Sequence, residues 1–257
     1  MSPVKTLLRP ALGLALAAVL CAAPVSASVI LNTLEGYEQL DPGWSGNLSG
    51  LFSGSGGNTE RILFEAGGKV QWQLEKDRLR LQASGGYEES AGLETARNVV
   101  VHLRHNRDLN EKLATVSFAQ VQHNPFQQLQ SRWLFGAGVR QYLWKDEKGN
   151  VSYGVTPMLE LERLEGHDDH LARGRLSVFL HIARHLSDSA RLDLVAFWQP
   201  LFSDFSDSRA TANLVFTVDM IGEVDLKVGV NVEDNATPPV GVERTDWQTY
   251  MGLGLDF

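Results

Sequence analysis

The chain has 257 residues, with 23 lysines and arginines against 31 aspartates and glutamates, and a formal net charge of −8. This acidic balance argues against a nucleic-acid-binding protein, which needs a basic surface to neutralise phosphates. Beyond the N-terminal region, no apolar run approaches the roughly 18 residues that a transmembrane helix requires. We therefore expect no membrane-spanning helix.

The N-terminal region has the pattern of a secretory signal. Lys5 and Arg9 form a basic start, residues 11–23 an apolar core, and residues 25–27 a small-residue cleavage site. The expected organisation is a signal peptide at residues 1–27, a lead at residues 28–43 that stays in the periplasm or enters a lumen, and a folded domain at residues 44–257.

Cysteine chemistry is not expected to contribute to the folded domain. Cys21 is the one cysteine of the chain. The large Leu20 before it disfavours lipid attachment, and signal removal would take Cys21 away. The mature chain would then contain neither disulfides nor a thiol nucleophile.

Alternation of apolar and polar residues recurs along almost the whole domain. In a β-strand, a period of two places all apolar side chains on one face. Residues 62–74, 151–161 and 224–232 are the clearest cases, and their apolar faces carry no charge. When the less regular segments 44–53 and 113–123 are counted with the alternating ones, we expect about twelve strands. The predicted fold class is all-β, a transmembrane antiparallel up-and-down β-barrel.

The lengths of the predicted connections support a barrel. Every second connection is short (residues 75–77, 108–112, 145–150, 187–189 and 221–222), whereas most of the others are longer and polar (residues 53–60, 88–96, 124–130, 163–172 and 234–244). Short periplasmic turns and longer outer loops are the usual asymmetry of outer-membrane barrels. A soluble β-sandwich has no reason to keep this parity.

The last strand ends on an aromatic residue. Trp247, Met251, Leu255 and Phe257 share one face, with small and polar residues on the other. A terminal Phe257 suits the aromatic girdle at the rim of a membrane barrel, and the alternating tail resembles the C-terminal signature of bacterial outer-membrane barrels. We expect Phe257 to be an assembly signal. The expected partners are then the outer-membrane lipid and the barrel-assembly machinery, with the barrel a monomer in the bacterial outer membrane.

Two stretches carry a resemblance to a known family. They are residues 56–59, Gly-Gly-Asn-Thr, and residues 98–142, which include Asn124-Pro125-Phe126 and Gly136-Ala137-Gly138-Val139-Arg140. Both are similar to the bacterial family of salt-induced outer-membrane proteins. The resemblance implies a small outer-membrane barrel and supplies no catalytic or binding residues.

The inward-facing positions are rich in charge. The expected lumen-lining residues are Arg104, Arg132, Arg140, Glu160, Glu162, Arg173, Arg175 and His181. Opposed charges in a lumen can set ion selectivity or orient a polar solute. They can also pair and fill a narrow interior, since twelve strands lie between barrels that side chains fill and barrels with an open channel. Both alternatives stay open from the sequence.

One hairpin permits a prediction of register. In an antiparallel pair, opposite positions sum to a constant. A sum of 335 around the loop at residues 167–170 would set Glu162 against Arg173 and Glu160 against Arg175, with the apolar residues together on the outer face. We therefore predict two inward-facing Glu–Arg pairs near the outer mouth.

The predicted function is passive: a narrow channel for ions or small polar solutes, or a barrel that supports the envelope under osmotic stress. An enzyme or metal site is the alternative, at the loop His167-Asp168-Asp169-His170, whose side chains suit borderline cations. A solvated loop tip explains the same residues. We expect no enzyme, no cofactor and no metal. We also expect the chain to lack the His-x-Ser sequence that outer-membrane phospholipases carry on their lipid-facing side.

Overall fold

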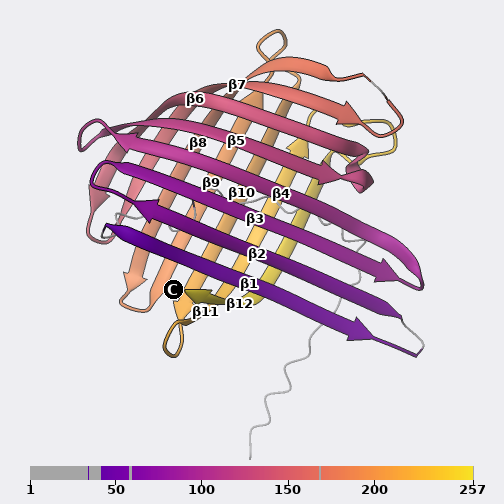
Figure 1. Ribbon diagram of the computed structural model, residues 1–257, viewed down its shortest axis with the longest axis horizontal. Coiled ribbons are helices and arrows are strands. Elements are labelled where there is room, and N and C mark those ends of the chain that lie inside the picture. Colours follow the sequence, from indigo (N-terminus) through magenta and orange to yellow (C-terminus); the bar gives the residue numbers. More distant parts are fainter. Residues whose placement is uncertain (1–33, 35–41, 58–59, 168, 257) are drawn as a thin grey trace, which may run out of the picture.

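The chain forms a closed antiparallel β-barrel of twelve strands in the computed structural model, which describes residues 34, 42–57, 60–167 and 169–256. The strands are β1 (Gly43–Ser55), β2 (Arg61–Gln73), β3 (Asp77–Ser90), β4 (Leu93–Asp108), β5 (Leu113–Asn124), β6 (Leu129–Asp146), β7 (Gly149–Leu164), β8 (Leu171–Ser187), β9 (Ala190–Pro200), β10 (Ser208–Asp219), β11 (Val224–Asn235) and β12 (Thr245–Asp256). Figure 1 shows the indigo and magenta strands β1 to β4 crossing in front of the orange and yellow strands β9 to β12. The predicted fold class and strand number are confirmed.

The barrel is apolar outside and polar inside, the reverse of a soluble protein. On β3, Leu81 is 49% exposed while the neighbouring Arg80 is 1% exposed, and on β7 Leu159 is 45% exposed while Glu160 is 1% exposed. The alternation of the sequence is therefore an alternation between the outer surface and the lumen. Such a surface is stable only against an apolar solvent, because each exposed apolar group costs free energy in water.

The two rims differ in their connections. At the rim where β1 begins and β12 ends, residues 74–76, 109–112, 147–148, 188–189 and 220–223 form connections of at most four residues, and we call this the turn rim. At the opposite rim, which we call the loop rim, the connections are residues 56–60, 91–92, 125–128, 165–170, 201–207 and 236–244. The predicted alternation of short turns and longer loops is observed, with one exception.

The exception is the predicted loop at residues 88–96, which is wrong. Strands β3 and β4 continue to Ser90 and from Leu93, so that Ala91 and Gly92 alone make the turn. Both have positive φ, 50° and 75°, which is the backbone of a two-residue hairpin turn. The charged residues around the turn suggested a loop, but here they lie on the ends of strands.

The connection between β5 and β6 contains a 3₁₀ helix, η1 (Pro125–Gln127). The Asn124 side chain accepts hydrogen bonds from the backbone N–H groups of Phe126 (3.1 Å) and Gln127 (3.2 Å). Pro125 stands at the first position of the helix, where its missing N–H costs nothing. No helix among the described residues is long and apolar enough to cross a membrane.

The barrel closes through a short seam. Four residue pairs, from Asn47 with Asp256 to Gly50 with Leu253, join β1 to β12. By contrast, β1 pairs with β2 along its whole length, and the next shortest ladder, between β8 and β9, has nine pairs. Beyond Gly50, the two strands have no ladder pairs among the described residues.

A membrane barrel of this kind should show heat-modifiable electrophoresis. We expect the folded chain to migrate faster in cold SDS than after boiling, because a closed ladder leaves no strand edge for the detergent to attack except at the seam. Recovery of the chain as a soluble monomer without detergent would contradict this expectation.

Candidate functional site in the barrel lumen

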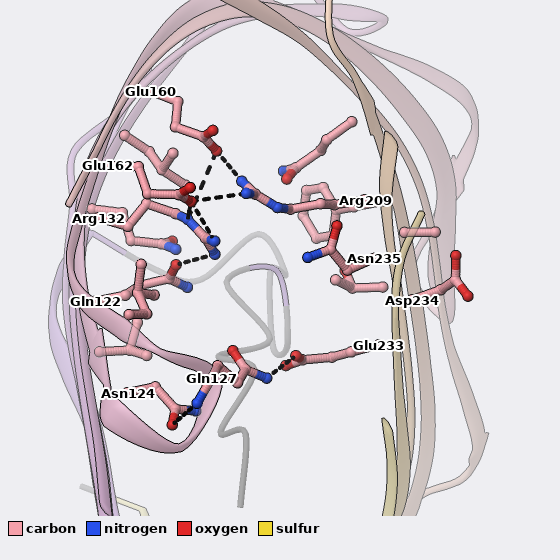
Figure 2. Close-up of a pocket in the computed structure, with 18 of the residues that line it drawn as sticks. Gln122, Asn124, Gln127, Arg132, Glu160, Glu162, Arg209, Glu233, Asp234 and Asn235 are labelled. Atoms are coloured by element: carbon pink, nitrogen blue, oxygen red, sulfur yellow. Dashed lines mark hydrogen bonds and ion pairs between the residues drawn. The ribbon is translucent and has the colours of Figure 1, made fainter. Parts of the chain in front are cut away.

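Two buried carboxylates from β7 organise the lumen near the loop rim. The Glu162 Oε2 atom accepts from Arg132 Nη2 at 2.6 Å and from Arg209 Nη2 at 2.8 Å. Arg209 also bonds to Glu160 through its Nη1 atom. Figure 2 shows the Arg209 guanidinium reaching from β10 to both carboxylates on the other side of the view. These side chains link β6, β7 and β10 through the lumen.

Arg175 is the most deeply held cation of this cluster. Its side chain is fully buried, with Nε 3.2 Å from Glu160 Oε1 and Nη2 2.9 Å from Asp207 Oδ1. Its Nη1 atom donates to the backbone carbonyls of Gln199 and Asp207, both at 3.1 Å. Arg175 thus ties β8 to β7, to β9 and to the connection between β9 and β10.

The predicted register of the β7–β8 hairpin is wrong by two residues. Glu160 lies opposite Arg173, and Glu162 lies opposite Leu171. The charged pairs still form, as diagonal neighbours: Arg175 with Glu160 at 3.2 Å and Arg173 with Glu162 at 3.6 Å. A shift of two residues keeps every side chain on its face, so the alternation could not distinguish the two registers. Long side chains then reach the diagonal position.

The opposite wall of the lumen is acidic. Gln127 of η1 extends across the mouth and donates to Glu233 of β11 at 3.3 Å and to Asp246 of β12 at 3.5 Å. Gln128 donates to the carbonyl of Val240 at 2.9 Å. In Figure 2, Gln127 and Glu233 approach each other below the arginine cluster. The η1 connection therefore narrows the entrance.

A cavity of about 380 Å³ lies between these groups. Arg132, Arg173 and Arg209 line it in equal number with Glu160, Glu162 and Asp207, and Glu233 and Asp246 line it beside Gln127. Of these cations, the Arg173 side chain is the most exposed, at 29%. A solute that enters from the loop rim therefore meets a cluster of paired arginines and carboxylates and, beside Gln127, two further carboxylates.

Deeper in the lumen, toward the turn rim, a second polar network surrounds Arg140. Its Nε atom donates to Ser152 Oγ at 3.0 Å, and its Nη2 atom lies 2.9 Å from His181 Nδ1. His181 Nε2 is 3.4 Å from Asp193 Oδ1, and all these side chains are buried. The network links β6, β7, β8 and β9 across this part of the lumen.

Arg104 and Leu34 also belong to this deeper region. The Arg104 guanidinium lies 5.4 Å from the ring centroid of Phe179. Leu34, which precedes β1, is fully buried in an apolar cluster with Ala114, Tyr142, Phe179 and Val195. One residue of the predicted lead thus lies inside the barrel, while residues 28–33 and 35–41 are outside the described part of the chain.

All eight lumen residues proposed from the sequence point inward, but at different depths. Arg132, Glu160, Glu162, Arg173 and Arg175 gather near the loop rim, whereas Arg140 and His181 lie deeper. Arg104 lies beside Phe179, and both also line the cavity. Sequence reasoning missed Arg209, although it shares the parity of the inward-facing Asn213. It also missed Asp207, Gln127, Glu233 and Asp246, which reach the cavity from the loop rim.

The structure describes the predicted metal loop only in part. Asp168 of the predicted metal loop lies outside the described residues, and His167 bonds the carbonyl of Glu165 at 3.0 Å in an exposed turn. Among the described residues no group of three or more metal-ligating side chains occurs. The expectation that the chain lacks a His-x-Ser sequence is wrong, because His185-Leu186-Ser187 ends β8. His185 shares the parity of the lumen-facing His181, but the ladder to β9 is irregular between His185 and Ser187, where Ser187 lies opposite Ala190. The histidine and the serine are therefore not placed on one face by alternation.

A closed, twelve-stranded barrel with an apolar outer belt and a charged lumen is the fold of bacterial outer-membrane proteins. Residues 50–257 match a family of proteins of unknown function, DUF481, and the chain belongs to that family. Phe257, the proposed assembly signal, falls within the matched segment but outside the described residues. No curated protein matches the sequence.

Comparison with solved structures agrees on the fold. The NanC porin is 12% identical with a TM-score of 0.50, and the match covers 82% of this chain and 98% of the porin. The KdgM porin, solved with disordered oligogalacturonate, is 8% identical with a TM-score of 0.43, covering 83% and 99% of the two chains. The CymD monoaromatic hydrocarbon channel is 11% identical with a TM-score of 0.42, covering 85% and 89%. These neighbours are porins and channels, and at such identities they are relatives in fold alone.

Proposed function

We propose that the protein is a narrow passive channel of the bacterial outer membrane for ions or small polar solutes. The observation that carries this proposal is the cavity of about 380 Å³ near the loop rim, lined by a cluster of arginines and carboxylates and by the further carboxylates Glu233 and Asp246. Fixed charges on opposite walls attract either end of a polar solute without binding a large apolar one. The charges that line the cavity are the means of selection, and no catalytic step is involved.

The bridges across the lumen set the width of the path. Arg209 joins β10 to β7, and Gln127 joins η1 to β11, so each divides the interior near the loop rim. A twelve-stranded barrel is intermediate between filled barrels and open porins. The proposed channel therefore passes ions and small solutes and excludes oligosaccharides.

A barrel that supports the envelope under osmotic stress is the second candidate. The tight packing around Leu34, Tyr142 and Phe179 toward the turn rim favours it. It is also the role that the resemblance to salt-induced proteins suggests. In either case we propose a monomer inserted by the barrel-assembly machinery, with Phe257 as part of the signal.

Ion selectivity tests the proposal. Replacing Glu233 by glutamine and Asp246 by asparagine should shift the reversal potential in a KCl gradient toward chloride, because two negative charges leave the wall. A unit charge at about 4 Å in water contributes about 1 kcal/mol, roughly fivefold in the permeability ratio. The matched change Arg173→Gln should shift the preference toward potassium.

The outcomes separate the two candidates. Stepwise conductance in a planar bilayer, with opposite shifts for the two variants, supports the channel. Folded wild-type protein that inserts without conductance contradicts the channel and leaves the envelope-supporting barrel. Conductance that neither variant changes would place the path away from this cavity.

A further inference from the structure

The seam between β1 and β12 is open over half its length. The ladder stops at Gly50 and Leu253, so residues 51–55 of β1 and 245–252 of β12 have no described partner across the seam. On their other sides both strands are fully paired, to β2 and β11. The two unpaired edges are thus held in place by their neighbours and lie opposite each other in the wall of the barrel.

An open edge at this position needs a partner. Backbone N–H and C=O groups that face hydrocarbon without hydrogen bonds cost several kcal/mol each. The exposed apolar residues Phe52 and Met251 place the open part of the seam within the lipid-facing belt. Whatever occupies the seam must therefore combine polar groups for the edges and the interior with apolar groups for the lipid.

A second cavity, of about 230 Å³, lies directly behind the opening. Leu51, Met251 and Leu253 line it at the seam, and Gly50 and Gly252 leave its entrance free of side chains. A Cβ atom built on Gly252 would meet nothing within 4 Å. Ligand pockets usually measure roughly 300–1,000 Å³, so this cavity suits the head of a lipid and not a whole lipid.

The inner wall of this cavity is polar and charged. Glu65, Lys69 and Lys227 line it, and Gln248 donates to Glu65 at 3.4 Å behind the seam. Asn231, only 5% exposed, lines the same cavity, and its Oδ1 atom has no hydrogen-bond partner among the described residues. A buried amide oxygen without a donor costs free energy, which a ligand with an N–H or O–H group would recover.

We propose that the open seam is a lateral portal that holds a single-chain zwitterionic phospholipid. Its phosphate would lie near Lys69 and Lys227, its ammonium group would donate to Asn231 and face Glu65, and its acyl chain would leave the barrel past Leu51 and Met251 into the bilayer. The two lysines and one glutamate match a head that carries both signs of charge. This site is separate from the proposed channel cavity, because its lining shares no residue with that cavity.

A strand from a second copy of the chain is the other possible occupant. An added strand would pair with the edges, but it would leave the cavity and the Asn231 oxygen unoccupied. The lipid accounts for the cavity, the charges and the gap together.

Photolabelling tests the portal. The probe is lysophosphatidylethanolamine with a diazirine in its acyl chain, added to the full mature barrel in lipid nanodiscs. Labelling should concentrate on Leu51, Met251 and Leu253 over lipid-facing residues far from the seam, such as Leu159. Asn231→Leu should reduce this excess about fivefold, the ratio that one hydrogen bond sustains. Thr217→Val, which also removes a buried polar atom without a partner but lies outside the cavity, should leave it unchanged.

A disulfide test measures the opening independently of the lipid. In a Cys21→Ser background, Leu48→Cys with Leu255→Cys lies on the closed part of the ladder, and Phe52→Cys with Met251→Cys continues the same register on the open part. The first pair should oxidise readily and the second should not, since a disulfide requires Cα atoms within about 7 Å. Equal oxidation of both pairs, or labelling without excess at the seam, would overturn the proposal. Concentration-dependent crosslinks between copies at Phe52→Cys would assign the seam to a second chain instead.

Discussion

Replacing Arg175 by methionine is expected to lower the free energy of unfolding by about 3–5 kcal/mol, the range for breaking a buried ion pair from one side. Arg175 is fully buried, and its loss would leave Glu160 and Asp207 with one fewer cation and two backbone carbonyls with one fewer donor. Glu160 would keep Arg209, so the effect should fall at the lower part of this range if Arg209 can compensate. Urea titration of the barrel in lipid vesicles, followed by tryptophan fluorescence, measures the change.

Arg173 provides a matched control on the same strand. It lies two residues away and also faces Glu160 and Glu162, but at 3.9 Å and 3.6 Å and with a side chain that is 29% exposed. Ion pairs with this much solvent contribute within about 1 kcal/mol. Equal losses for Arg173→Met and Arg175→Met would show that the depth of burial does not determine the strength of this cluster.

Gly138→Ala should destabilise the barrel by about 1–3 kcal/mol or more, the range for overpacking an interior. A Cβ atom at Gly138 would lie 2.1 Å from the Val155 carbonyl oxygen and 2.7 Å from the Thr156 Cα atom. Both obstacles are backbone atoms of the neighbouring strand β7, so no side-chain rotation can relieve the clash. The strands β6 and β7 would have to separate at this point.

Gly252→Ala is the control for this change, since a Cβ atom there meets no other atom within 4 Å. Its midpoint of unfolding should stay close to that of the wild type. The fraction of heat-modifiable barrel and the urea midpoint measure both variants. A Gly138→Ala barrel as stable as the Gly252→Ala barrel would mean that the close approach of β6 and β7 is not required for folding.

The pair of glycines also explains why the Gly136-Ala137-Gly138 stretch stands out in the sequence. A Cβ atom at Gly136 would lie 2.5 Å from the ring of Phe118, which occupies the space inside β6. Both glycines point into the lumen, where the Phe118 ring of β5 and the β7 chain at Val155 and Thr156 lie against them. Their presence follows from the packing of the interior and not from a ligand.

The fold was predictable from the sequence because two independent patterns agreed. The alternation assigned each residue of β2, β7 or β11 to the lipid side or the lumen side, and the parity of the connections ordered the rims. The tight turn at Ala91 and Gly92 was missed, since its flanking glutamates resemble those of a solvated loop. Charge alone does not distinguish the end of a strand from a loop.

The site was less predictable than the fold. Alternation fixes the face of a residue but not its height in the barrel, so Arg132 and Arg140 appeared equivalent although they belong to different groups. The two-residue error in the β7–β8 register has the same origin. The open seam between β1 and β12 and the crossing of η1 over the mouth depend on the three-dimensional closure of the barrel, which no local pattern reports.

Cysteine accessibility along β11 tests the central claim most directly, namely that the strands cross a bilayer with lipid on one face and a water-filled lumen on the other. In a Cys21→Ser background, single cysteines at Lys227 and Glu233 should react with a charged, membrane-impermeant thiol reagent. Cysteines at Val228, Val230 and Val232 should react only with a lipid-soluble reagent, because Val228 and Val230 are exposed on the outer face. Reaction of the valine positions with the charged reagent would contradict the account. So would a failure of the Lys227 and Glu233 positions to react with it.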